Sequence, residues 1–126
     1  MTLEEQKSAY ERELKALDSA TSKMCRRMHF STVFDILHES GLPYRLVQDW
    51  YDFAGTPFKH GYRYRFESSY DSPAMLYVQE TDAGRIQHRS MHDAIAALRG
   101  LLESRLREID RAVSMTRKLR YAHAKP

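Results

Sequence analysis

The feature that most constrains this 126-residue chain is a long apolar repeat near its C-terminal end. Ser90 followed by Asp93 is typical of a helix start. A helix from Met91 to about Leu119 would be roughly 43 Å long, whereas a compact domain of this size has a diameter of roughly 36 Å. The helix must therefore pair with another long helix, project from its domain or dock on a second copy. The repeat consists of Met91, Ile95, Leu98, Leu102, Leu106, Ile109 and Val113.

A second helical repeat occupies the N-terminal end of the chain. Residues 4–28 contain neither Gly nor Pro and are rich in Glu, Lys, Ala and Leu, so we expect one long amphipathic helix. Heptad spacing favours packing against another helix, either within the chain or in a homodimer formed through the long helices. The apolar positions are Leu3, Tyr10, Leu17 and Met24, interleaved by Leu14, Thr21 and Met28.

The next segment predicts two short helices separated by Gly41. Thr32 and Asp35 indicate the first start, and Pro43 fits the first turn of a second helix that ends at Gly55. Tyr44 to Val47 also fit an extended segment.

Residues 33–53 can be tested as a DNA-reading helix-turn-helix. The second helix would expose Asp49 and Asp52 against Arg45, which is unfavourable beside phosphates. A helical hairpin that builds the core is therefore preferred.

After Pro57 the apolar period changes from helical spacing to two, which is typical of strands. We expect strands at Tyr62–Phe66, at the apolar run Ala74–Val78 and at Arg85–Arg89, joined as a three-stranded antiparallel meander. The predicted fold class is α+β, with elements in the order α-α-α-β-β-β-α. Residues 1–113 form a single domain in this prediction, and residues 114–126 form a basic helical extension or tail.

No residue pattern indicates an enzyme, a cofactor or a metal. Cys25 is the only cysteine, so an internal disulfide and a thiolate cluster are excluded. His88 and His92 are four residues apart, a spacing that would place both on one face of a helix and so suit a metal. Ser90 should start a helix between them, so they do not share one helix face. No apolar run approaches the ~20 residues that span a bilayer, and no signal peptide is evident. We therefore expect a cytoplasmic protein that does not contact a membrane.

Positive charge is concentrated at the C-terminal end. The chain has a net charge of +3, but residues 111–126 hold five basic and no acidic residues. The rest of the chain has 20 − 5 = 15 basic residues against 17 acidic ones. Such asymmetry indicates a charged partner. The five basic residues are Arg111, Arg117, Lys118, Arg120 and Lys125.

The predicted strand at residues 62–66 alternates aromatic and basic side chains. Tyr62, Tyr64 and Phe66 share one face, and Arg63 and Arg65 share the other. An exposed aromatic face can stack unpaired bases while arginines contact phosphates. The alternative, which we favour, is that the aromatic residues form core beneath the long helices.

Two hypotheses for function follow. The first is a small nucleic-acid-binding accessory or regulatory protein, with DNA favoured over RNA, whose basic C-terminal helix contacts phosphates, together with Arg63 and Arg65. The second is a protein-binding adaptor or inhibitor of the kind found among phage and plasmid accessory proteins. It would dock on a larger complex and present its basic tail to an acidic protein surface.

Overall fold

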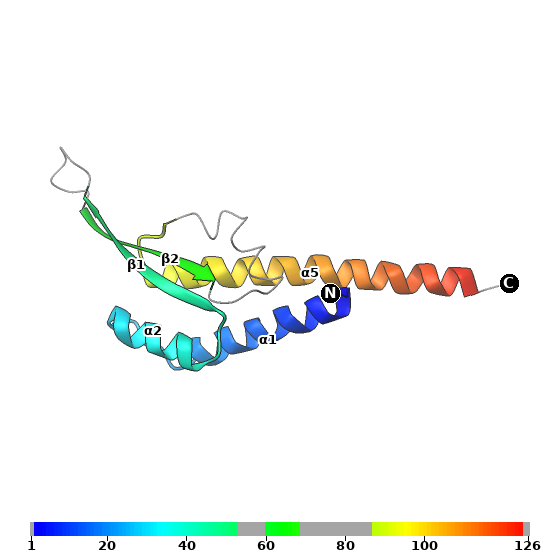
Figure 1. The fold of residues 1–126 in the computed structure, drawn as a ribbon, viewed down its shortest axis with the longest axis horizontal. Coiled ribbons are helices and arrows are strands. Elements are labelled where there is room, and N and C mark those ends of the chain that lie inside the picture. The colour runs from blue at the N-terminus through cyan, green and yellow to red at the C-terminus, as the bar shows by residue number, and fades with distance from the viewer. Residues whose placement is uncertain (1, 53–59, 69–86, 125–126) are drawn as a thin grey trace.

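The computed structural model describes residues 2–52, 60–68 and 87–124. These residues form an α+β fold in the order α1 (Leu3–Thr21), α2 (Phe30–Glu39), β1 (Tyr44–Asp52), β2 (His60–Ser68) and α5 (Met91–Ala124). Figure 1 shows α1 and α5 side by side and antiparallel, with the β1–β2 hairpin crossing near the start of α5 and extending away from the helices. The predicted fold class is confirmed.

The core is built mainly where α1 packs against α5. Leu17 on α1 and Leu102 on α5 have no exposed surface, and full burial of each such side chain stabilises the fold by about 1.5–3 kcal/mol. The buried positions on both helices recur at three- and four-residue steps, as the apolar repeats predict. Those of α5 are Ala94, Ile95, Leu98, Leu102, Ile109 and Val113.

Helix α5 begins where the sequence predicts and continues beyond its expected end. The Asp93 backbone N–H donates to Ser90 Oγ at 3.0 Å, so Ser90 caps the first turn. The helix runs to Ala124 rather than to about Leu119, and its 34 residues correspond to a length of about 51 Å.

The prediction that one helix spans residues 4–28 is wrong, because α1 ends at Thr21. The hydroxyls of Thr21 and Ser22 donate to the carbonyls of Asp18 and Ser19. Such local bonds compete with continuation of the helix. Met24 and Met28 still pack against the core, but from the connection between α1 and α2. The heptad pattern therefore marks core residues correctly but not the helical boundary.

The predicted second helix of the hairpin is also wrong, since residues 44–52 form strand β1. Helix α2 ends at Glu39, and Gly41 adopts a left-handed backbone with φ of +83° that turns the chain toward the strand. In β1 the buried Tyr44 and Leu46 alternate with the exposed Arg45. Pairing with β2 decides the conformation here, because each strand provides the other with hydrogen bonds that a helix would have made internally. Both the helical hairpin and the helix-turn-helix alternative are thereby excluded.

The three-stranded meander is not confirmed, because the described sheet has two strands. The strand predicted around residues 62–66 is correct and belongs to β2. The predicted strand at residues 74–78 lies outside the described residues. Within the predicted return at residues 85–89, the described part contains an isolated bridge from His88 to Tyr64.

We expect Gly41→Ala to destabilise the fold by roughly 1–2 kcal/mol, because a Cβ disfavours the left-handed backbone. A Cβ at Gly41 would meet no atom within 4 Å, so the cost is one of conformation. Gly100→Ala is the matched control, since Gly100 lies within α5 and is equally uncrowded. Alanine should stabilise that helix by up to about 1 kcal/mol. Urea unfolding of both variants measures the two effects, and effects of the same sign would contradict the assignment.

Candidate functional site

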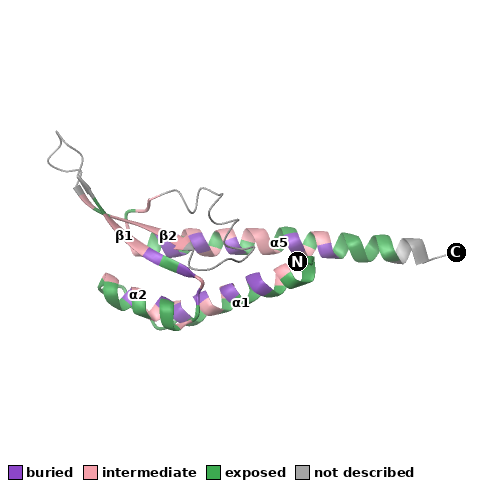
Figure 2. Cartoon of the chain, in the orientation of Figure 1, coloured by how far each residue is buried: buried purple, intermediate pink, exposed green. Residues whose placement is uncertain are grey.

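The C-terminal part of α5 leaves the core and is surrounded by solvent. Among the residues of α5 whose burial is described, which end at residue 120, Val113 is the last buried one, and every residue from 114 to 120 is exposed (Figure 2). The N-terminal end of α1 reaches this region through two ion pairs. Lys7 Nζ lies 2.8 Å from Asp110 Oδ1, and Arg117 Nη2 lies 3.8 Å from Glu4 Oε1. We call residues 111–120 the basic end of α5.

Four of the predicted site residues lie in the basic end of α5, and all four are exposed. They are Arg111, Arg117, Lys118 and Arg120. Within the described part of the chain, Arg111, Lys118 and Arg120 have no carboxylate within ion-pair distance. The contact of Arg117 with Glu4 is long and largely exposed, and such pairs contribute about 0–1 kcal/mol. The basic end therefore presents cations that the fold does not neutralise. Lys125, the fifth predicted residue of this group, lies outside the described residues.

The cations of the basic end lie on two sides of the helix. At 3.6 residues per turn, Arg111 and Lys118 share one side, whereas Arg117 and Arg120 lie together on another. Met115 and Leu119, four residues apart, are 64% and 58% exposed. The surface is thus positive around much of the helix and carries an apolar edge.

A second projecting element is the β1–β2 hairpin, whose residues pair from Tyr44 with Ser68 to Asp52 with His60. Burial decreases from the root of this hairpin toward its far end (Figure 2). Leu46 and Phe66 are buried against the helices, Tyr64 is half-buried, and Trp50 and Tyr62 are exposed. The interpretation that all the aromatic residues of β2 form core is therefore correct at the root of the hairpin and wrong toward its far end.

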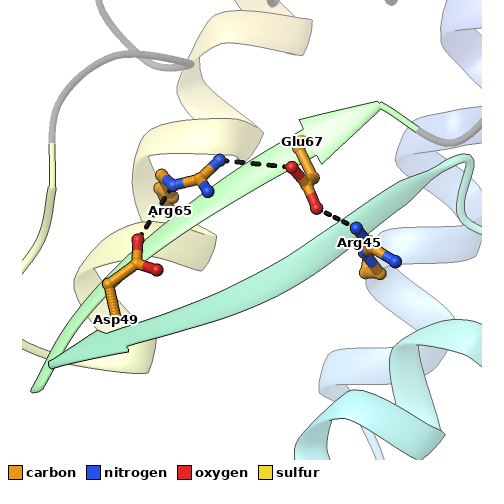
Figure 3. Close-up of polar contacts among 4 residues, drawn as sticks. All are labelled: Arg45, Asp49, Arg65 and Glu67. Carbon is orange, nitrogen blue, oxygen red and sulfur yellow. Dashed lines mark hydrogen bonds and ion pairs between the residues drawn. The ribbon is translucent and has the colours of Figure 1, made fainter.

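The other face of the hairpin carries the two predicted strand arginines, which differ in their contacts. Arg65 Nε lies 3.0 Å from Asp49 Oδ2, and its Nη1 lies 3.4 Å from Glu67 Oε2 (Figure 3). Burial lowers the pKa of Arg65, but the bond and charge of Asp49 and then Glu67 outweigh it and raise the pKa above its ordinary value. Arg63 Nη1 instead donates to the Tyr62 carbonyl at 2.9 Å. The sheet thus brings both arginines to one face but neutralises only Arg65.

Glu67 also binds Arg45 across the hairpin (Figure 3). The hydrogen bond from Arg45 is the main reason why the pKa of Glu67 lies below its ordinary value. Arg45 and Arg65 therefore share the Glu67 carboxylate, Arg65 also binds Asp49, and both arginines contribute to the hairpin itself.

Trp50 is the exposed residue that sequence reasoning missed. In the helix predicted for this segment, its neighbours would be the residues three and four positions away. In the sheet it lies directly opposite Tyr62, with ring centroids 5.1 Å apart and planes at 74°. The sequence did offer one indication of this pairing. If the extended alternative for residues 44–47 is continued to Trp50, this residue lies in a strand that can pair with Tyr62.

The root of the hairpin is held by a buried hydrogen bond between β1 and α1. The Tyr44 hydroxyl donates to Glu13 Oε2 at 2.9 Å, and both side chains are buried. Burial raises the pKa of Glu13 to about 7, although the bond from Tyr44 and the charge of Arg12 oppose the increase. Burial and the charge of Glu13 raise the pKa of Tyr44. This contact joins the hairpin to the helix pair that carries the basic end of α5.

An open groove lies between the α1–α2 connection and the first third of α5. Its volume is about 890 Å³. Met24, Met28 and Met91 line it together with Ile95, and Arg26 and Glu103 add polar groups. The groove therefore offers an apolar surface that sequence reasoning did not anticipate, because segments far apart in the sequence build it.

Across residues 2–52, 60–68 and 87–124, no helix combines the length and apolar character needed to cross a membrane. The same residues contain no group of three His, Cys, Asp or Glu side chains placed to hold a metal ion. Ser90 does start α5 between His88 and His92, as the sequence predicts.

Comparisons of the chain with protein-family models, with curated proteins and with solved structures find no match. Function must therefore be inferred from the geometry, exposure and charge of the two projecting elements.

We expect the pH dependence of stability to change in Glu13→Gln. Folding raises the pKa of Glu13 from about 4.5 to about 7, so its contribution is most favourable below pH 4.5 and is lost as the pH rises through 7. Between pH 4.5 and 7 the wild type should lose about 3 kcal/mol through this group. Gln retains an acceptor for Tyr44 but does not ionise. Urea unfolding at several pH values measures the difference between the proteins, and equal pH slopes would contradict the assignment.

Proposed function

We propose that this protein binds nucleic acid, with DNA as the expected form, through the basic end of α5. The observation that carries the proposal is that residues 114–120 of α5 are exposed and that residues 111–126 of the chain contain no acidic residue. Lys and Arg side chains on such a surface can neutralise the phosphate groups of nucleic acid. In this proposal Arg111, Arg117, Lys118 and Arg120 bind phosphates and provide affinity without reading sequence.

A role in stabilising the helix dipole does not account for these cations. The dipole favours positive charge only within about the last turn of a helix. Because α5 runs to Ala124, Arg111 and Arg117 lie more than one turn from its end. Their exposure and weak pairing therefore support a role toward a partner.

In the proposed complex the two arginines of strand β2 have different roles. Arg65 is bound to two carboxylates, so releasing it toward a phosphate would leave Asp49 and Glu67 without that partner. Arg63 has no such competing bond in the described residues, and it is the hairpin arginine that we expect to contact nucleic acid. We further propose that this binding serves an accessory or regulatory role in the cytoplasm. Such a role requires binding but no catalysis by this chain.

Salt dependence provides the sharpest test. If all five C-terminal cations bind duplex DNA, the logarithm of affinity should fall with a slope of about −4.5 against the logarithm of salt. Between 50 and 200 mM salt this amounts to a loss of about 500-fold. Fluorescence anisotropy with a labelled duplex measures the slope.

Matched variants assign the contact to the basic end of α5. The triple substitution Arg117→Ala, Lys118→Ala and Arg120→Ala should reduce the slope by about 2.7, and alanine preserves the helix. The control removes the same charge from exposed residues elsewhere, Lys15, Lys23 and Arg27. Equal losses in the two triple variants, or an affinity independent of salt, would contradict the proposed site.

A second candidate function, docking on a protein, is supported by the methionine-lined groove. Flexible methionines adapt to irregular apolar surfaces, and amphipathic helices bind in such grooves. Affinity purification from the native host with and without nuclease separates the two functions. A partner that survives nuclease and is lost in Met91→Glu, while Met115→Glu retains it, would favour the groove. A partner lost with nuclease would favour nucleic acid.

A further inference from the structure

The far end of the hairpin brings two large aromatic side chains together in solvent. Both the N–H and the carbonyl of Tyr64 bond to His88 at 2.8 Å, so they point away from β1. Tyr62, two residues away, has the same orientation, and its pairing with Trp50 is therefore of the non-hydrogen-bonded type. Such pairs bring opposing side chains closest, in agreement with the ring separation of 5.1 Å.

These two rings remain exposed although residues on the same face are buried. Trp50 and Tyr62 are 57% and 49% exposed, whereas Leu46 and Phe66 are 1% and 3% exposed. The hairpin extends away from α5 (Figure 1), and Trp50 and Tyr62 each lie two residues from the far end of their strand. Single exposed apolar residues are common, but adjacent aromatic rings on a projecting element mark a binding surface.

A cation lies at the strand edge next to Tyr62, although the Arg63 side chain starts from the opposite face of the hairpin. The Arg63 guanidinium bonds to the Tyr62 carbonyl at 2.9 Å, on the edge of β2 that points away from β1. Arg45 and Arg65 are bound to carboxylates, whereas in the described ranges Arg63 has none within ion-pair distance. Asp49, which lies opposite Arg63 in the register, binds Arg65 instead, so the surface combines two aromatic rings with one arginine outside the ion pairs of the described residues.

We propose that Trp50, Tyr62 and Arg63 form a stacking site for an unpaired base of single-stranded nucleic acid. A base contacts an aromatic ring through its face, and the neighbouring phosphate is attracted to arginine. Bases within a duplex are already stacked on one another and cannot offer that face. The site therefore selects single strands, and it rests on the proposed function by naming the form of nucleic acid that the hairpin recognises.

Trp50 makes this site directly observable, because it is the only tryptophan in the chain. Titration of the full chain with oligothymidine should quench tryptophan fluorescence, whereas a duplex of the same length should not. Anisotropy of labelled oligonucleotides measures affinity in parallel. Stacking on one ring contributes about 1–3 kcal/mol, so Tyr62→Ala should weaken single-strand binding by about 5- to 150-fold and leave duplex binding unchanged.

Conservative and matched variants separate stacking from other effects. Tyr62→Phe keeps the ring and should retain single-strand affinity. Arg63→Ala should reduce the single-strand salt slope by about 0.7. Arg45→Ala, which removes a charge already bound to Glu67, should leave the slope unchanged. Thermal unfolding verifies that each variant is folded, which is expected because the changed side chains contribute little to the core.

The outcomes distinguish this inference from the proposed function. Binding of single strands without quenching, and with full affinity in Tyr62→Ala, would overturn the stacking site while the basic end of α5 retains its role. Absence of binding to both single strands and duplexes at low salt would overturn the proposed function and the stacking site together. A protein partner that quenches Trp50 when no oligonucleotide does would assign the hairpin to protein docking instead.

Discussion

The antiparallel packing of α1 against α5 is the interaction on which the rest of the structure depends. It buries the most enclosed residues of the chain, including Leu17 and Leu102, and it provides the surface on which the hairpin root rests. The two helices differ in length, with 19 residues in α1 and 34 in α5. Since α1 cannot cover all of α5, part of the longer helix must extend into solvent. The exposed basic end is therefore a direct consequence of the packing that builds the core.

The two projecting elements differ in how many of their basic side chains are paired with carboxylates, and the functional proposal depends on this difference. In the hairpin, acidic and basic side chains face one another across two strands, so Arg65 is neutralised by Asp49 and Glu67. The basic end of α5 itself contains no acidic residue, and among the described residues only Glu4 of α1 lies within ion-pair distance of one of its arginines. Arg63 is the exception within the hairpin. Positive charge is thus least neutralised along residues 114–120 of α5, and in the hairpin the exposed aromatic rings lie near Arg63, which has no carboxylate within ion-pair distance among the described residues.

Several elements could be predicted because their causes are local. The Ser90 cap and the apolar repeat that follows it depend on neighbouring residues, and the structure confirms both. Apolar residues alternate with polar ones in the strand around residues 62–66, and this period of two does not give a helix an apolar face. The end of α1 was missed because Met24 and Met28 reach the core without being helical. Strand β1 was missed because its apolar residues fit both periods, and because its pairing partners lie between 8 residues (Asp52 and His60) and 24 residues (Tyr44 and Ser68) farther along the chain.

Local sequence was sufficient to establish the α+β class, the start of the long helix and the concentration of positive charge at the C-terminal end, because each depends on composition or on neighbours within a few turns. The basic residues of the candidate site are accordingly evident from the chain's charge distribution alone. Contacts between distant segments decided what these residues can do. Strand pairing placed Trp50 opposite Tyr62 and gave Arg65 its carboxylates, while the extent of α1 determined where α5 leaves the core. These properties depend on the register of the two strands and on how far α1 extends along α5. The apolar periodicity of a single segment specifies neither of them.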